Sequence, residues 1–76
     1  MNNLRDKELL ILFGNHLRNL RKLNNYTLET LAYESEMEIS QIYRIEKGKI
    51  NPTLSTLNSL AAALKIPLCD LLTFKQ

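Results

Sequence analysis

Helix-breaking residues divide this chain at four places, and the divisions leave room only for helices and short turns. The breaks fall at Asn24-Asn25, at a turn around Glu36, between Gly48 and Pro52, and at Pro67. Gly and Asn accept the left-handed backbone that ends a helix, and Pro lacks the N–H that would continue one. Between the breaks, Leu, Ala, Glu, Lys, Arg and Asn abound and strand formers are sparse. The pattern therefore predicts an all-α chain of five helices.

The first two predicted helices each show one apolar face. The first runs from about Asp6 to Leu23, and its apolar residues recur at steps of three and four. These inward residues are Leu10, Phe13, Leu17 and Leu20. Thr27 offers a hydroxyl that can cap the second helix, which ends near Glu36. The inner face of the second helix consists of Leu28, Leu31, Ala32 and Ser35.

The remaining three predicted helices are short. The third spans Ile39 to Lys47 and ends at Gly48, with Ile42 and Ile45 on its inner face. The fourth follows a turn at residues 51–53 and directs five apolar residues inward, Leu54, Leu57, Leu60, Ala61 and Leu64. Pro67 ends it, and the leucines that follow, Leu68, Leu71 and Leu72, indicate one last short helix.

Length and composition exclude several classes of protein. The 76 residues suit a single domain over residues 1–76 with one modest core. A formal net charge of +2 is compatible with nucleic acid but too small to indicate it alone. Cys69 has no partner for a disulfide or a metal site, and His16 has no nucleophile at motif distance. The longest apolar run, residues 9–13, is far too short to span a membrane. We therefore expect a cytoplasmic protein with no metal, cofactor, catalytic site or small-molecule ligand.

Two stretches in the middle of the chain carry a family signature. Thr27-Leu28-Glu29-Thr30-Leu31-Ala32 is followed by Ile42-Tyr43-Arg44-Ile45-Glu46-Lys47-Gly48-Lys49-Ile50-Asn51-Pro52. Together they resemble the helix-turn-helix of phage repressor and Cro (Xre-type) proteins, and the resemblance extends over most of the chain. It implies a compact five-helix, lambda-repressor-like DNA-binding domain whose second and third helices form the helix-turn-helix.

The resemblance implies that the third helix reads base edges in the major groove of DNA. The base-reading positions are Ile39, Ser40, Gln41 and Arg44. Arg44 is the strongest candidate, because a guanidinium can donate to both O6 and N7 of guanine. Ile39 stands where many relatives have Gln and could contact only a thymine methyl, so the DNA target should differ from theirs.

Contacts to the DNA backbone are expected on both sides of that helix. The candidates are Thr27 and Leu28 at the start of the second helix, and Tyr43, Lys47, Lys49 and Asn51 at or after the third. Leu28 replaces a Gln that is frequent in the family, which removes one side-chain contact to phosphate. Four acids in this region, Glu29, Glu34, Glu36 and Glu38, lie in a stretch without Lys or Arg. We therefore expect modest nonspecific affinity for DNA.

Four further positions are expected to have architectural roles. Glu36 stands where the family often has Gly with positive φ, at a cost of about 1 kcal/mol if that backbone is required. Glu38 precedes the third helix, where its carboxylate could cap the helix. Arg21 and Glu46 match positions that form a partly buried ion pair in the family, which would fix the first helix on the third.

The predicted function is that of a transcriptional regulator, not an enzyme, which binds a pseudo-palindromic double-stranded DNA operator as a homodimer. One recognition helix covers too few base pairs to single out a genomic site. The expected dimer interface comprises Leu68, Leu72 and Phe74, with part of residues 9–12. Restriction-modification controllers, phage switches and antitoxin components all stay open as roles. The alternative is a protein-interaction module or antitoxin-type protein that binds a partner, with incidental DNA binding.

Overall fold

The computed structural model describes residues 3–75, and the side chains of residues 6–75, as five α-helices joined by short turns. The helices are α1 (Asn3–Leu23), α2 (Leu28–Ser35), α3 (Ile39–Glu46), α4 (Leu54–Ala63) and α5 (Leu68–Leu71). The described residues contain no strand, so the all-α prediction is confirmed. The expected start of the first helix at Asp6 is wrong, because α1 begins at Asn3 and Asp6 lies in its first turn. The acid complements the helix dipole from inside the helix.

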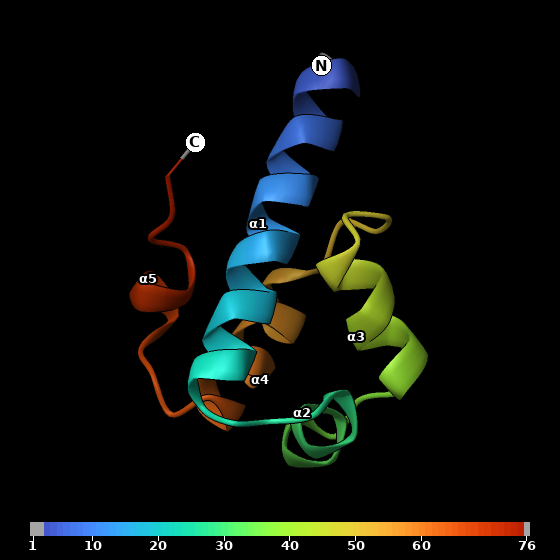
Figure 1. The fold of residues 1–76 in the computed structure, drawn as a ribbon. Helices are drawn as coiled ribbons and strands as arrows, with labels where there is room; N and C mark the ends of the chain where they lie inside the picture. Colours follow the sequence, from blue (N-terminus) through green and yellow to red (C-terminus); the bar gives the residue numbers. More distant parts are fainter. Residues whose placement is uncertain (1–2, 76) are drawn as a thin grey trace.

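The four shorter helices surround α1. In Figure 1, α3 lies on one side of α1 and α5 on the other, α4 lies behind it, and α2 lies beneath its C-terminal end. Direct contacts join α1 to α3, α2 to α3 and α4, and α4 to α5. None of the described helices combines the length and hydropathy of a membrane-spanning segment.

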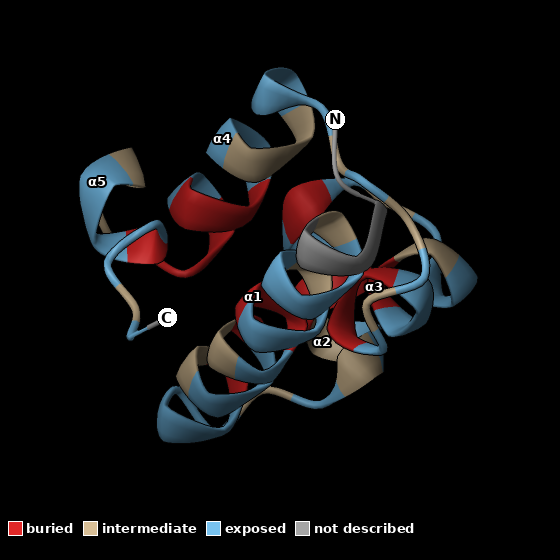
Figure 2. Cartoon of the chain, turned by 90° about the horizontal axis from the view of Figure 1, so that it is seen from above, coloured by how far each residue is buried: buried red, intermediate tan, exposed pale blue. Residues whose placement is uncertain are grey.

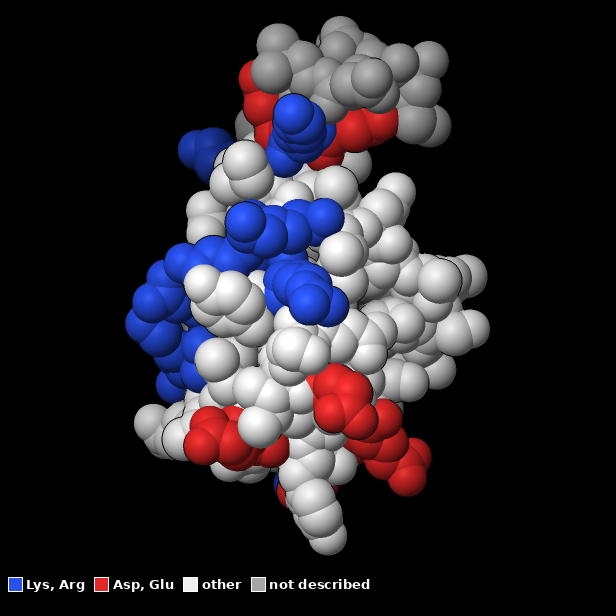
Figure 3. Space-filling view, turned by 90° about the vertical axis from the view of Figure 1, so that its right-hand side faces the viewer, with Lys and Arg blue, Asp and Glu red and all other residues white. Residues whose placement is uncertain are grey.

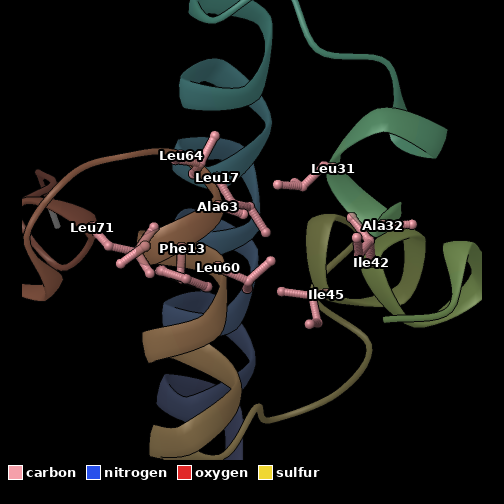
Figure 4. Packing of buried hydrophobic residues seen from close by; sticks show 11 residues of the cluster. Phe13, Leu17, Leu31, Ala32, Ile42, Ile45, Leu60, Ala63, Leu64 and Leu71 are labelled. Atoms are coloured by element: carbon pink, nitrogen blue, oxygen red, sulfur yellow. The ribbon is translucent and has the colours of Figure 1, made fainter. Parts of the chain in front are cut away.

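One apolar core joins all five helices. Figure 2 shows that the buried residues of each helix face the middle of the molecule. The largest fully buried side chains are Leu17, Leu31, Ile42, Ile45, Leu60, Leu64 and Leu71. Figure 4 shows them converging from different helices. The predicted inner faces of the second and third helices are thereby confirmed. Leu54 was expected inward but is exposed, because it is the first residue of α4 and extends past the core.

The turns depend on residues with left-handed backbone. Asn25, Glu36 and Lys65 have φ of 59°, 57° and 59°, and Gly48 has φ of 71°. Glu36 therefore takes the strained conformation expected for it. Lys65 has a left-handed backbone that the sequence does not predict, because lysine is not among the residues that favour positive φ.

Side-chain caps begin two of the helices. Thr27 Oγ1 accepts a hydrogen bond from the Thr30 N–H at 3.0 Å, and Thr53 Oγ1 accepts one from the Thr56 N–H at 3.1 Å. The cap expected from Glu38 is wrong, since its side chain makes no hydrogen bond to the start of α3. A Glu side chain is one methylene longer than Asp and is not among the preferred N-cap residues.

The two glycines of the chain both lie where α3 meets α1. A Cβ on Gly14 would collide with the Glu46 carbonyl oxygen and would lie 2.6 Å from that of Ile45. A Cβ on Gly48 would lie 2.8 Å from Cα of Ile11. These contacts leave no space for a side chain, so α3 can pack this closely on α1 only where glycine stands.

A buried ion pair joins the same two helices. Arg21 Nε donates to Glu46 Oε2 at 2.7 Å, and Nη2 donates to Oε1 at 3.1 Å. The third nitrogen, Nη1, donates to the carbonyl oxygen of Tyr26 at 2.9 Å. Both side chains are buried, with relative exposures of 10% and 5%. The guanidinium therefore connects α1, α3 and the turn before α2.

We expect Glu46→Ala to lower the free energy of unfolding by about 3 kcal/mol, because it leaves the Arg21 guanidinium buried without its counter-charge. The double change Arg21→Met with Glu46→Leu should recover much of that loss. Urea unfolding followed by circular dichroism would measure both, with the exposed Glu34→Ala as control. A Glu46→Ala midpoint no lower than that of Glu34→Ala would contradict a buried pair.

We expect Glu36→Gly to raise the free energy of unfolding by about 1 kcal/mol, because glycine adopts positive φ without strain. For a domain of this size the melting midpoint should rise by roughly 4–8 °C. Glu34→Gly makes the same chemical change inside α2 and should lower the midpoint instead. If a thermal scan shows a lower melting midpoint for both variants, the backbone at Glu36 is not strained.

Candidate nucleic-acid interface

The turn between α2 and α3 is short and closed by backbone hydrogen bonds. The Glu36 N–H donates to the Tyr33 carbonyl oxygen at 3.3 Å, and the Met37 N–H donates to that of Ala32 at 2.9 Å. Ala32 is buried where the two helices meet, and α3 begins at Ile39. These bonds and this contact fix the orientation of α3 relative to α2.

The outer face of α3 is polar and exposed, whereas its inner face is buried. Ile42, Ile45 and Glu46 face the core. At 3.6 residues per turn, Ser40, Arg44 and Lys47 fall within about 60° of one another on the opposite side. All three are exposed, Gln41 is half-buried at one flank, and Ile39 is exposed at the helix start. The structure thus brings the four predicted base-reading residues onto one short, solvent-facing helix.

One flank of α3 carries a cation held over an aromatic ring. Lys47 Nζ lies 5.6 Å from the centre of the Tyr43 ring, a cation–π contact one turn apart on the helix. Both side chains remain exposed. The ring restrains the lysine beside the helix, where its ammonium remains available to an anion.

The start of α2 offers backbone donors more than side chains. The Thr27 hydroxyl caps Thr30 and also lies 2.9 Å from Thr30 Oγ1. Leu28 is half-buried and packs against the core. The N–H groups of Leu28 and Glu29 belong to the first turn and have no partner within the helix. An anion at this end would therefore be bound by backbone amides.

Two more predicted phosphate contacts lie in the loop between α3 and α4. Lys49 and Asn51 are both exposed. The Lys49 N–H donates to the Arg44 carbonyl oxygen at 2.9 Å, which keeps the loop against the end of α3.

Charge is distributed unevenly over this side of the molecule. Figure 3 shows a band of Lys and Arg that runs from the upper centre to the left edge of the face that carries α3. Acidic side chains lie below the band, toward the end that carries α2, and others lie at the top. The four acids predicted to limit the DNA face, Glu29, Glu34, Glu36 and Glu38, are all exposed. A polyanion would therefore meet the band more favourably than the α2 end.

Residues 17–71 match the sequence pattern of HTH_3, a helix-turn-helix family. The chain belongs to this helix-turn-helix family. The matched residues run from the middle of α1 through α5, so the family pattern includes the whole helix-turn-helix and the core beneath it.

Several relatives in the family have names that state a role. The HTH-type transcriptional repressor RghR of Bacillus subtilis is 45% identical over 56 residues, which cover 72% of this chain and 42% of that protein. The chain also spans 40% and 43% of two other regulators that it matches. The control protein C.BamHI of Bacillus amyloliquefaciens is 34% identical over 65 residues, which cover 84% of this chain and 80% of that protein.

A solved structure extends the likeness to three dimensions. The restriction-modification controller protein C.AhdI of Aeromonas hydrophila matches with a TM-score of 0.80 and 37% identity. The match covers 82% of this chain and 94% of that chain. The five-helix fold is therefore the fold of this helix-turn-helix family.

A groove beside α3 includes residues of α1 that are not among the predicted site residues. The groove has a volume of about 340 Å³ and lies between α1, α3 and the start of α2. Its walls include Ile11, Asn15 and Arg18 of α1, facing Tyr43 of α3 and Lys47 directly after it. These α1 residues stand four and three positions apart, so they form one exposed stripe of the helix. Nothing in the local sequence separates these residues from the other exposed residues of α1, so only the position of α3 beside them reveals the groove.

The predicted dimer residues lie on another side of the fold. Leu72 is 45% exposed, whereas Leu68 and Phe74 are half-buried against the core. The Phe74 ring lies 5.8 Å from the ring of Phe13 and 5.3 Å from that of His16. An apolar groove of about 280 Å³ includes Leu9, Phe74 and Leu72 in its walls. The C-terminal segment and the N-terminal half of α1 thus form one surface.

Proposed function

We propose that this chain is a transcriptional regulator that binds duplex DNA sequence-specifically, with α3 in the major groove. The observation that carries the proposal is the exposed polar face of α3, which is held rigidly by a buried opposite face. An α-helix with its side chains is about as wide as the major groove, so this face can reach base edges. Arg44 would read guanine, and Ile39 would contact a thymine methyl.

The names of the relatives support regulation as the biological role. One is a transcriptional repressor, one is a restriction-modification controller protein, and one is named a control protein. The two control proteins match this chain over most of both sequences, whereas the repressor is much longer. Among the roles left open by the sequence, we therefore favour a restriction-modification controller working in the cytoplasm. A neighbouring methyltransferase gene would support this role, and a neighbouring toxin gene would contradict it.

One observation favours the alternative of a protein-interaction module. Tyr33 of α2 is 82% exposed, and exposed acids stand on the same short helix. An exposed aromatic ring among charges can serve as a protein contact. Selection of bound duplexes from a random pool separates the two functions. An enriched motif supports the regulator, and no enrichment at low salt supports the interaction module.

On the selected duplex, Arg44→Ala should weaken binding by about 1–3 kcal/mol and relax the preference at one base pair, because a bidentate base contact is lost. Lys47→Ala should instead weaken all sequences alike and lower the slope of log K against log salt by about one. Fluorescence anisotropy on selected and scrambled duplexes measures both effects. Equal losses on the two duplexes for Arg44→Ala would refute its base-reading role.

We further propose that the working unit is a symmetric homodimer. The apolar groove near Leu72, with exposed Leu9 and Leu12 on the N-terminal half of α1, leaves apolar surface that one chain does not cover. A two-fold axis through this surface would double the recognition helix without any further element. The operator would then be a pseudo-palindrome whose half-sites are about one helical turn apart.

Light scattering at micromolar concentration should therefore give twice the mass of the chain, and the operator complex should contain two chains. Inserting half a turn between the half-sites should abolish tight binding, because the second helix would face away from its groove. Leu72→Asp should favour the monomer, while Leu23→Asp changes an exposed leucine at the other end of α1 from Leu9 and should not. One chain per operator with an asymmetric footprint would overturn the dimer.

A further inference from the structure

We infer that the groove between α1 and α3 is a binding site for a phosphate of the DNA backbone, with Arg18 as its principal ligand. The inference rests on the proposed DNA-binding function and adds α1 to the contact surface. The walls of the groove hold four groups that can donate hydrogen bonds to an anion: the side chains of Asn15, Arg18, Tyr43 and Lys47.

The electrostatics of the groove favour an anion. Arg21 and Glu46 also lie in its walls, but they neutralise each other, and all three nitrogen atoms of Arg21 already donate hydrogen bonds. Arg18 and Lys47 are the two other charged residues of the groove, and among the described residues neither forms an ion pair. Two cations thus face the groove without a counter-ion. Figure 3 shows Lys and Arg gathered on this same side of the molecule.

The position of the groove selects a DNA phosphate as the occupant. A helix that fills the major groove has the two phosphate backbones at its flanks, because helix and groove are both about 12 Å wide. Tyr43 and Lys47 are on a flank of α3 and line the groove, so a wall of the groove is the flank of the recognition helix itself. Arg18 lies across the groove from them on α1. One phosphate backbone of the DNA would therefore pass along the open groove that α1 and α3 form.

The Arg18 contact would position the protein and would carry no sequence information. Arg18→Gln removes the charge and keeps a polar side chain of moderate length at an exposed position, so the fold should persist. Each phosphate contact contributes about 0.9 to the slope of log K against log salt. Over a fourfold increase in KCl, the parent protein should therefore lose about 3.5-fold more affinity than Arg18→Gln does.

The experiment measures this slope by fluorescence anisotropy, using the full chain with a selected duplex and a scrambled duplex. Arg18→Gln should lower the slope by about one on both, and Arg18→Lys should restore it. Lys65→Gln makes a matched loss of charge in the turn between α4 and α5, on the other side of α1 from α3, and should leave the slope unchanged. Circular dichroism confirms that each variant is folded.

A scan of single neutral methylphosphonates along the selected duplex then locates the contact. At one phosphate, neutralisation should weaken binding by the parent protein but not by Arg18→Gln. The inference is overturned if Arg18→Gln has the slope of Lys65→Gln, if its loss is confined to the selected duplex, or if no phosphate shows this coupling. In those three outcomes the parent still selects a motif and the proposed function stands. If the parent binds neither duplex, both the function and the phosphate site are wrong.

Discussion

The contact between α1 and α3 sets the position of every group that faces outward from the recognition helix. An isolated helix of eight residues is unstable in water, so α3 exists through its packing against the rest of the fold. Glycine at positions 14 and 48 lets the two helices approach until carbonyl oxygens and Cα atoms leave no space for a Cβ. A larger residue at Gly14 would move the recognition helix away from α1 as a rigid unit.

The Arg21–Glu46 pair sets the geometry of this contact but adds little to its stability. A buried ion pair loses hydration on both sides, so its net contribution to stability is small compared with an apolar pair of similar volume. Its hydrogen bonds are directional, however, and they run from Arg21 of α1 to Glu46 of α3 and to the Tyr26 carbonyl oxygen before α2. One guanidinium thereby sets the relative positions of the three segments that surround the groove beside α3.

Local signals in the sequence predicted the elements, whereas contacts between distant residues decided the details that it missed. Periodicity and breakers predicted five helices and the buried faces of α2 and α3, because each signal lies within one helix. The close approach at Gly14 depends on Ile45 and Glu46, about 30 positions further along the chain, which no local pattern reveals. Likewise, Asn15 and Arg18 look like ordinary exposed residues of α1 until α3 is placed beside them. The predicted base-reading residues come from the family signature, and both their role and their contacts remain predictions.

Under the proposed DNA-binding function, the uneven charge pattern gives the acids at the α2 end a role in discriminating between orientations of the protein on DNA. Nonspecific affinity comes from phosphate contacts in any orientation, so a protein that is basic on every side binds DNA everywhere. Here the basic residues gather beside α3, while exposed acids occupy the α2 end, and the formal net charge is only +2. An orientation that brings the acids to the backbone is repelled, whereas docking through α3 keeps the band of Lys and Arg against phosphate. Because specificity is a ratio of affinities, lowering the affinity of the wrong orientations raises it without any further contact to a base.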